Sequence, residues 1–317
     1  MWNNLSSNIF QWKTIVYNKS TDTFALGIPV DGMDIKYTSP LSIGWIITGK
    51  CNLKCMHCYW NEEELPSDEV SADEAMIIAS KIITEGIKRV SISWGEPMLR
   101  KDLPKIVDYL SDNGVWVIVS TNGLNVSDKL PQLKKLRHIE LSLDGATEKI
   151  HDYIRPARIS WQSISFKNAI LGIKAALDMG IKTRVLTTLN IYNYKDIWKM
   201  WVLLSNLWVH EWHIGRTTNA WRARFIYNWL MDGVMFNESD LEQLKNDFPN
   251  IKIQYNYPSK ASKYYGLIIP NWQMATQDYR TWEKIALGSL VEKSFGDFWT
   301  EDNFDIRGHY YKWLNLN

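Results

Sequence analysis

All three cysteines of this chain lie in one short segment, CNLKCMHC, at residues 51–58. The spacing Cys-x3-Cys-x2-Cys allows one irregular loop to direct three thiolates at a common centre. Iron–sulfur cubes are held by thiolates, usually four of them. A four-iron cube bound by Cys51, Cys55 and Cys58 would leave one iron without a protein thiolate. That iron would be free to bind a small molecule, which suggests a function for the segment.

A Cys3His zinc site is a second interpretation of the same cysteines. The spacing argues against it, because zinc sites usually pair Cys-x2-Cys knuckles. Three unliganded core cysteines are a third interpretation, but the loop contains Lys and Asn and does not form an apolar face. A histidine would complete a zinc site, and the candidates are His57, His138, His151, His210 and His213.

An alternation of strands and helices between residues 41 and 215 must position this loop. Ser71 and Glu74 form a capping-box pattern at the start of one helix, and Gly86 marks its end. Buried strands joined by helices imply parallel pairing, so the sheet is either doubly wound or a barrel. Strands are expected at 41–48, 88–93, 115–120, 138–143, 182–190 and 209–215, and helices at 71–86, 103–114, 127–135, 162–180 and 194–207.

Polar motifs follow the end of each expected strand. In both candidate folds, ligands gather at the carboxyl ends of the strands. The sequence therefore predicts one binding site built from six strand ends. The motifs are TGKCNLKCMHC, WGEP, STNG, SLDG, TLN and GRTTN.

The cysteine loop and the strand-end motifs together resemble the radical S-adenosylmethionine (radical SAM) enzymes. The resemblance covers residues 41–215 and extends weakly to the end of the chain. It implies an α/β fold, a partial (β/α)6 TIM-like barrel over residues 41–237 that follows an N-terminal preamble at 1–40. It also implies a [4Fe–4S] cluster held by the three cysteines, with S-adenosylmethionine at the open iron.

The resemblance further implies contacts to S-adenosylmethionine. Gly95, Glu96 and Pro97 match the family turn whose backbone meets the methionine amino group. Taken singly, several of the remaining residues are also typical of turns or strand-end caps, Asn122 and Ser142 among them. The residues that match positions contacting the methionine carboxylate or the ribose are Ser120, Asn122, Ser142, Asp144, Arg155 and Asn190.

In the mechanism that the resemblance implies, the reduced cube passes one electron to S-adenosylmethionine. The sulfonium bond breaks, and a 5′-deoxyadenosyl radical removes a hydrogen atom from the substrate. The cofactor supplies this chemistry, and the barrel supplies orientation and a dry site. An electron donor such as ferredoxin or flavodoxin is the implied partner.

Residues 238–317 are expected to form a small α+β appendage. It resembles the SPASM or twitch extension of some relatives but contains no cysteine, so auxiliary clusters are excluded by ligand count. Relatives with such extensions often modify peptides or build cofactors. The main hypothesis is therefore a ribosomal peptide substrate, with a small molecule of cofactor biosynthesis as the alternative. Five residues near the last barrel strand either face the substrate or form a solvated rim: His210, His213, Arg216, Arg222 and Arg224.

The composition gives no electrostatic reason to expect nucleic acid or a membrane as a partner. The net charge is +1, 45% of the residues are hydrophobic, and no stretch is long and apolar enough to span a bilayer. The odd number of closely spaced cysteines favours metal use in a reducing compartment over disulfides. We expect a cytoplasmic protein.

The 17 tryptophans are the unusual feature of the composition. Several occupy positions where backbone conformation favours glycine, such as Trp94 before Gly95. We hypothesise that the gene uses UGA codons that mean glycine and that are translated here as tryptophan. If Trp94 is genuine, the indole crowds the cofactor site, and a non-catalytic metal-binding protein or pseudoenzyme becomes the alternative. The positions in question are Trp94, Trp208, Trp221, Trp272 and Trp282.

Overall fold

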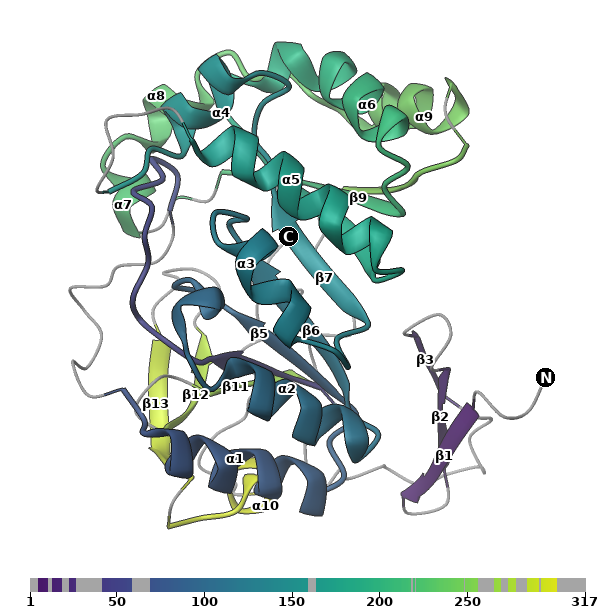
Figure 1. The fold of residues 1–317 in the computed structure, drawn as a ribbon, viewed down its shortest axis with the longest axis vertical. Coiled ribbons are helices and arrows are strands. Elements are labelled where there is room, and N and C mark those ends of the chain that lie inside the picture. The colour runs from purple at the N-terminus through teal and green to yellow at the C-terminus, as the bar shows by residue number, and fades with distance from the viewer. Residues whose placement is uncertain are drawn as a thin grey trace.

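The N-terminal strands form a small sheet of their own. The computed structural model describes residues 5–10, 13–18, 23–26, 42–58, 69–158, 164–217, 219, 221–247, 249–255, 265–268, 273–277, 284–290 and 292–300. Strands β1 (Leu5–Phe10), β2 (Lys13–Asn18) and β3 (Thr23–Leu26) pair antiparallel in chain order, as a meander. This sheet stands to one side of the larger body in Figure 1.

The six strands expected between residues 41 and 215 are all present and lie side by side in chain order. Each pairs in parallel with the next, so their carboxyl ends share one edge. The α/β prediction is confirmed. The strands are β4 (Ser42–Ile46), β5 (Arg89–Ser93), β6 (Trp116–Thr121), β7 (His138–Ser142), β8 (Lys182–Leu189) and β9 (Glu211–Arg216).

Helices connect these strands, and Figure 1 shows α1, α2, α3 and α5 covering one side of them. Both bonds of the capping box between Ser71 and Glu74 are formed at the start of α1. The helix expected at 127–135 is shorter, because Pro131 lacks an N–H donor and opens a 3-10 turn. The helices are α1 (Ala72–Thr84), α2 (Leu103–Asp112), α3 (Val126–Lys129), α4 (Glu148–Ile154), α5 (Ser165–Asp178) and α6 (Ile197–Asn206).

Strands from the C-terminal region extend the same sheet beyond its two outermost barrel strands. β10 (Lys252–Tyr255) pairs in parallel with β9, and β11 (Tyr265–Ile268) pairs in parallel with β4. β12 and β13 then continue the sheet antiparallel, and the described strands leave it open, as in a partial barrel. The remaining elements are α7 (Trp221–Arg224), α8 (Tyr227–Met231), α9 (Glu238–Asp247), β12 (Gln273–Gln277), β13 (Lys284–Ser289) and α10 (Phe295–Thr300).

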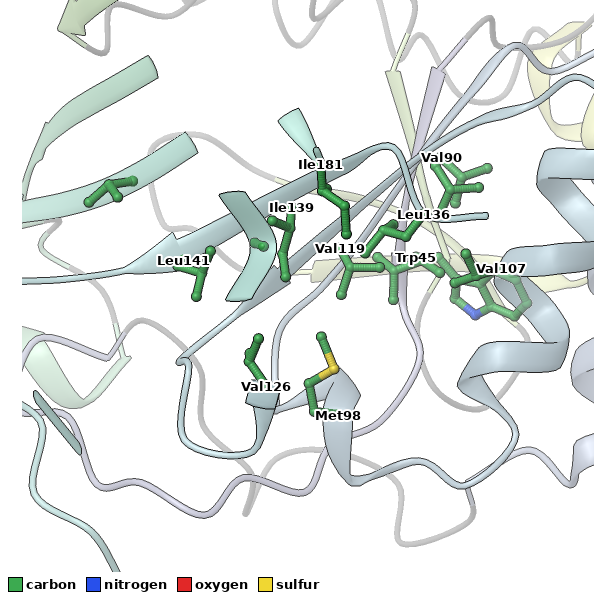
Figure 2. Packing of buried hydrophobic residues seen from close by; sticks show 14 of the residues in the cluster. Trp45, Val90, Met98, Val107, Val119, Val126, Leu136, Ile139, Leu141 and Ile181 are labelled. Atoms are coloured by element: carbon green, nitrogen blue, oxygen red, sulfur yellow. The ribbon is translucent and has the colours of Figure 1, made fainter. Parts of the chain in front are cut away.

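Strands such as β5 divide their side chains between two environments. In β5, Val90 and Ile92 are fully buried against the helices, whereas Ser91 and Ser93 line a cavity on the other face. This alternation follows from the two-residue period of a strand. Figure 2 shows part of the apolar side, where Trp45, Val90 and Val107 are among the labelled side chains. The apolar layer fixes the strands, and the opposite face is left for polar residues.

Two tryptophans have backbone conformations that are rare for residues with a side chain. Trp94 and Trp208 both have φ of +60°, and they are the only non-glycine residues with positive φ in the part of the chain described. Trp221 begins α7 and has no such conformation. Trp272 and Trp282 lie outside the described residues.

No helix in the described ranges combines the length and the apolar character that crossing a membrane requires.

Candidate active site

A cavity of about 380 Å³ lies at the carboxyl ends of the barrel strands and extends between them. Its upper wall contains the three cysteines, together with Gly95, which follows β5. Its lower wall consists of residues that point inward from the strands. The inward residues are mostly small or polar, and Leu186 adds an apolar side chain: Ser91, Ser93, Ser120, Glu140, Ser142, Leu186, Thr188, His213 and Gly215.

Backbone hydrogen bonds hold the cysteine loop in place from the opposite side of the barrel. Lys54 donates to the Pro156 carbonyl at 2.8 Å, and Met56 donates to the Ile154 carbonyl at 3.0 Å. Leu53 and Ala157 form an isolated antiparallel bridge beside these bonds. Residues 154–158, at the end of α4 and after it, therefore fix the shape of the loop, and we call this segment the clasp.

Burial dominates the chemistry of the cysteine thiols. It raises the pKa of Cys51 and the pKa of Cys55 to about 11, because a thiolate loses its hydration there. Buried thiols of this kind are inert as nucleophiles at neutral pH. A bound metal displaces such a proton and compensates the negative charge, so the sulfurs are suited to ligation.

Beside the loop, three buried side chains form a charged cluster. Arg155 Nε donates to Asp144 Oδ2 at 2.5 Å, and His57 Nε2 lies 3.3 Å from the same oxygen. Burial opposes the ionisation of Asp144, but the Arg155 guanidinium holds its pKa below the usual range. Burial lowers the pKa of His57 to about 4, so its imidazole is neutral. The cluster therefore contains a compensated ion pair and a neutral histidine.

The turn that follows β5 brings the backbone close to the cysteine loop. Gly95 has φ of +62°, and a Cβ at this position would lie 2.4 Å from the Thr48 carbonyl oxygen and 2.8 Å from that of Lys50. Only glycine fits this approach. The next residue, Glu96, is fully buried and accepts hydrogen bonds from the Met98 and Asn122 backbone and from the Thr121 hydroxyl.

A second charged network lies deeper, on the inward face of the strands. Arg184 pairs with Glu140 on one neighbouring strand and with Glu211 on the other, at 2.5 Å in the latter case. Lys182 adds a contact to Glu211 at 3.0 Å, and the Ser120 hydroxyl donates to Glu140. The network ties β6, β7, β8 and β9 together below the cavity.

Comparison with known protein families agrees with this geometry. The model of the Radical SAM superfamily matches residues 45–203, which is half of the chain. The chain belongs to the radical SAM superfamily. Members of this superfamily use a [4Fe–4S] cluster and S-adenosylmethionine, and the synthase and the maturase named below are enzymes.

Relatives in the superfamily differ in substrate. The chain is 24% identical over 295 residues to Fe-coproporphyrin III synthase of Methanosarcina barkeri, covering 81% of this chain and 73% of that protein. It is 29% identical to the mycofactocin maturase MftC of Mycobacterium tuberculosis, covering 47% of this chain and only 38% of the maturase. The structure of Streptococcus suis SuiB bound to S-adenosylmethionine has a TM-score of 0.72 at 15% identity, covering 95% of this chain and 88% of SuiB. The fold is therefore that of radical SAM proteins.

The donor set fits a radical SAM cluster. All three sulfurs face one cavity, and thiolates are the ligands that iron–sulfur clusters use. Among the described residues, no three His, Cys, Asp or Glu side chains converge as a single metal ion requires. In a four-iron cube each thiolate binds a different iron, so the cysteine sulfurs stand further apart than the ligands of a single metal ion. His57, a candidate zinc ligand, directs Nε2 toward Asp144 and Arg155.

The structure separates the residues expected to contact S-adenosylmethionine into two groups. Those behind the cavity wall are Glu96, Pro97, Asp144 and Asn190, and they do not line it. Asn190 is fully buried, and its side-chain oxygen accepts from the Tyr192 backbone at 2.9 Å. Those that line the cavity with the cysteines are Gly95, Ser120, Asn122, Ser142 and Arg155.

Several residues of the radical SAM cavity were not predicted. Ser91, Ser93 and Glu140 line it, and their alternation with apolar residues in the strands was the available signal. Of the five residues near the last barrel strand, His213 and Arg222 line the cavity. His210, Arg216 and Arg224 are exposed. The clasp at 154–158 had no sequence signal, because backbone hydrogen bonds between distant segments do not depend on side-chain type.

Proposed function

We propose that Cys51, Cys55 and Cys58 hold a [4Fe–4S] cluster and that the chain uses S-adenosylmethionine to remove a hydrogen atom from a peptide substrate. The observation that carries this proposal is the shared cavity, which three cysteines from one loop line together with Gly95 and the inward faces of the strands. When bound, the cluster and S-adenosylmethionine supply reductive cleavage to a 5′-deoxyadenosyl radical. A one-electron donor such as ferredoxin or flavodoxin is the partner that this chemistry needs.

In this proposal the chain's own residues bind and orient S-adenosylmethionine and exclude water from the cavity. The close approach at Gly95 leaves its backbone beside the cysteine loop, where it is placed to meet an amino group. Ser142 lines the same cavity and offers a hydroxyl to a carboxylate or a ribose. Glu96, Pro97, Asp144 and Asn190 position these groups from behind, since they are buried and hydrogen-bonded within the protein or packed there.

A peptide is the substrate class that we favour. The inward faces of the strands offer hydroxyls, the Glu140 carboxylate and the His213 imidazole, while Leu53 and Leu186 add apolar surface to the same cavity. We expect a cavity of about 380 Å³ with this mixed lining to accept one side chain of a peptide. The relative MftC is a maturase, and the SuiB fold has been solved with its precursor peptide SuiA. Both observations support a peptide by analogy.

A small molecule of cofactor biosynthesis is the second candidate. The observation in its favour is the alignment with Fe-coproporphyrin III synthase, which covers 81% of this chain. Deuterium-labelled candidates separate the two classes, since the true substrate transfers deuterium into 5′-deoxyadenosine.

Anaerobic reconstitution tests the proposal as a whole. We expect about four irons per chain and, with dithionite, cleavage of S-adenosylmethionine to 5′-deoxyadenosine. Cys55→Ala provides the matched control, because the backbone bonds of the loop remain. Uptake of zinc without iron, or iron uptake without cleavage, would contradict the proposal.

A further inference from the structure

Arg155 is fixed in an orientation that directs one N–H group at a cysteine sulfur. Its Nη1 lies 3.7 Å from Cys55 Sγ, within hydrogen-bonding range for sulfur. Its Nε donates to Asp144, and its Nη2 lies 3.3 Å from His57 Nε2. The guanidinium is therefore held on three sides, and the side chain is 8% exposed.

Asp144 itself has no freedom to follow a moving arginine. Its second carboxylate oxygen accepts from the Thr188 backbone at 2.8 Å, and the side chain is fully buried. At the other end, the Arg155 carbonyl accepts from the Ser165 hydroxyl at 2.9 Å. These bonds fix the position of the N–H group before any cofactor binds.

A neutral donor occupies the corresponding place at a second cysteine. Asn122 Nδ2 lies 3.8 Å from Cys51 Sγ, and the same nitrogen donates to Asn52 Oδ1 at 2.7 Å. The Asn122 oxygen accepts from the Leu124 backbone at 2.9 Å, which fixes the amide orientation. The sulfurs of Cys51 and Cys55 thus each face an N–H group on a rigid support.

We infer that Arg155, positioned by Asp144, raises the reduction potential of the cluster by donating a hydrogen bond to the Cys55 sulfur. The inference rests on the proposed function. Hydrogen bonds to cluster sulfurs and nearby positive charge stabilise the reduced state, which carries one more negative charge. Arg155 is a positioning residue here, because it acts through Cys55 and the cluster.

Redox titration of the reconstituted protein, followed by the EPR signal of the reduced cluster, tests the inference. At a fixed potential, Arg155→Gln should lower the ratio of reduced to oxidised cluster at least tenfold, which is about 59 mV for one electron. Arg155→Lys should lower it as well, because one ammonium cannot bond both Asp144 and the sulfur in the guanidinium geometry. Arg155→Lys also keeps the charge that Asp144 requires for folding.

Arg222 offers a matched control at the same cysteine. Its Nη1 donates to the backbone carbonyl of Cys55 at 3.1 Å, so Arg222→Gln removes a neighbouring positive charge but no bond to sulfur. We expect its potential to change less than that of either Arg155 variant. Equal potentials in Arg155→Lys and the wild type, or equal shifts in Arg155→Gln and Arg222→Gln, would overturn the inference. A wild-type protein that binds no iron would overturn the proposed function instead, and this inference with it.

A second inference comes from four turns that share one geometry. Helices α1, α2, α5 and α6 each lead into the next strand through the same pair of backbone bonds. In α2, the Gly114 N–H donates to the Ser111 carbonyl and the Val115 N–H to the Leu110 carbonyl, which is a Schellman motif. The residue at the centre of each turn has positive φ: Gly86, Gly114, Gly180 and Trp208.

Trp208 is the exception in this series. Its φ of +60° is close to the values of +75°, +80° and +69° at the three glycines. Its side chain is 77% exposed, so no burial compensates for the strained backbone. Trp94 shows the same conflict at the cavity, where its φ of +60° precedes the φ of +62° at Gly95.

We infer that positions 94 and 208 are glycine in the protein that the source organism makes, because it reads the codon translated here as tryptophan as glycine. The same reasoning predicts genuine tryptophan where the indole is used. Trp45 and Trp212 are fully buried, and the Trp212 Nε1 donates to the Thr187 hydroxyl at 2.9 Å.

Peptide mass spectrometry of the native protein, isolated from its source, tests this second inference. We expect glycine at 94 and 208, with tryptophan at 45 and 212 in the same digest. Tryptophan at 94 or at 208 would overturn the inference. Glycine at 45 or 212 would also overturn it, because backbone strain would then fail to separate the two kinds of position.

Discussion

The parallel strands begin along one edge of the sheet, the amino edge, and end along the opposite one, the carboxyl edge. These two edges are built in different ways. At the amino edge, one turn recurs after α1, α2, α5 and α6, with the same two hydrogen bonds each time. At the carboxyl edge every connection differs, and three of them carry the cysteines, Gly95 and Arg155. Repetition at one edge and variety at the other indicate that the first closes the fold and the second binds ligands. Changes at the amino edge should therefore affect stability, and changes at the carboxyl edge should affect the cofactor.

Cys55→Ala should have the largest effect and should be confined to function. We expect loss of the cluster and of 5′-deoxyadenosine formation, because two thiolates cannot hold the cube that three hold. The free energy of unfolding of the apoprotein should change little, since backbone bonds at Lys54 and Met56 keep the loop in place. Iron analysis and urea denaturation measure the two quantities. A strongly destabilised apoprotein would show that the carboxyl edge also supports the fold.

Arg184→Gln should act mainly on stability and lower the free energy of unfolding. Its network lies between the two edges and ties the strands together. The substitution leaves Glu140 and Glu211 buried without their main cation. Breaking a buried pair in this way costs about 3–5 kcal/mol of unfolding free energy. Removal of the exposed pair between Lys245 and Glu242 should cost at most about 1 kcal/mol and serves as the control. Urea denaturation of the apoproteins measures both, and similar losses would contradict the assignment.

Two glycines allow the edges to be compared by one substitution. Gly95→Ala should cost about 3 kcal/mol, since the new Cβ meets two backbone oxygens and φ is positive. Gly114→Ala should cost about 1 kcal/mol, because nothing lies within 4 Å and only φ opposes it. Only Gly95→Ala should also weaken S-adenosylmethionine binding. Calorimetric titration of the reconstituted proteins checks this, and equal affinities would remove Gly95 from the proposed site.

Acid should weaken the Arg184 network between the two edges. Burial opposes ionisation of Glu211, but Arg184 and Lys182 lower its pKa from 4.5 to about 2. A lowered pKa in the folded state gives stability that is present above pH 4.5 and is lost as the pH falls toward 2. We expect a loss of about 2 kcal/mol from this group. Glu211→Gln should lack this part of the pH dependence, and parallel curves for the two proteins would contradict it.

The sequence was sufficient to predict the six parallel strands and a cavity at their carboxyl ends. Capping residues such as Ser71 and Glu74 act within one helix turn, and polar strand ends share an edge wherever strands are parallel. The roles of individual polar residues were less accessible. Glu96 belongs to a turn whose backbone is expected to meet the cofactor, and its side chain accepts from the Asn122 backbone N–H after the next strand. Which partner a polar group finds depends on segments distant in sequence, and that information is not local.

The smallest expected effect on stability comes from Trp208, a single exposed residue at the amino edge. Trp208→Gly should raise the unfolding free energy by about 1 kcal/mol, because glycine adopts positive φ without the cost borne by a side chain. Trp198→Gly provides the control, since Trp198 lies in the first turn of the same helix and is 41% exposed. There glycine should lower the free energy by about 0.5 kcal/mol through lower helix propensity. Urea denaturation of both variants decides the matter. Opposite signs would show that the amino edge requires glycine at position 208, whereas destabilisation by both would mean that the Trp208 side chain contributes contacts that outweigh its backbone strain.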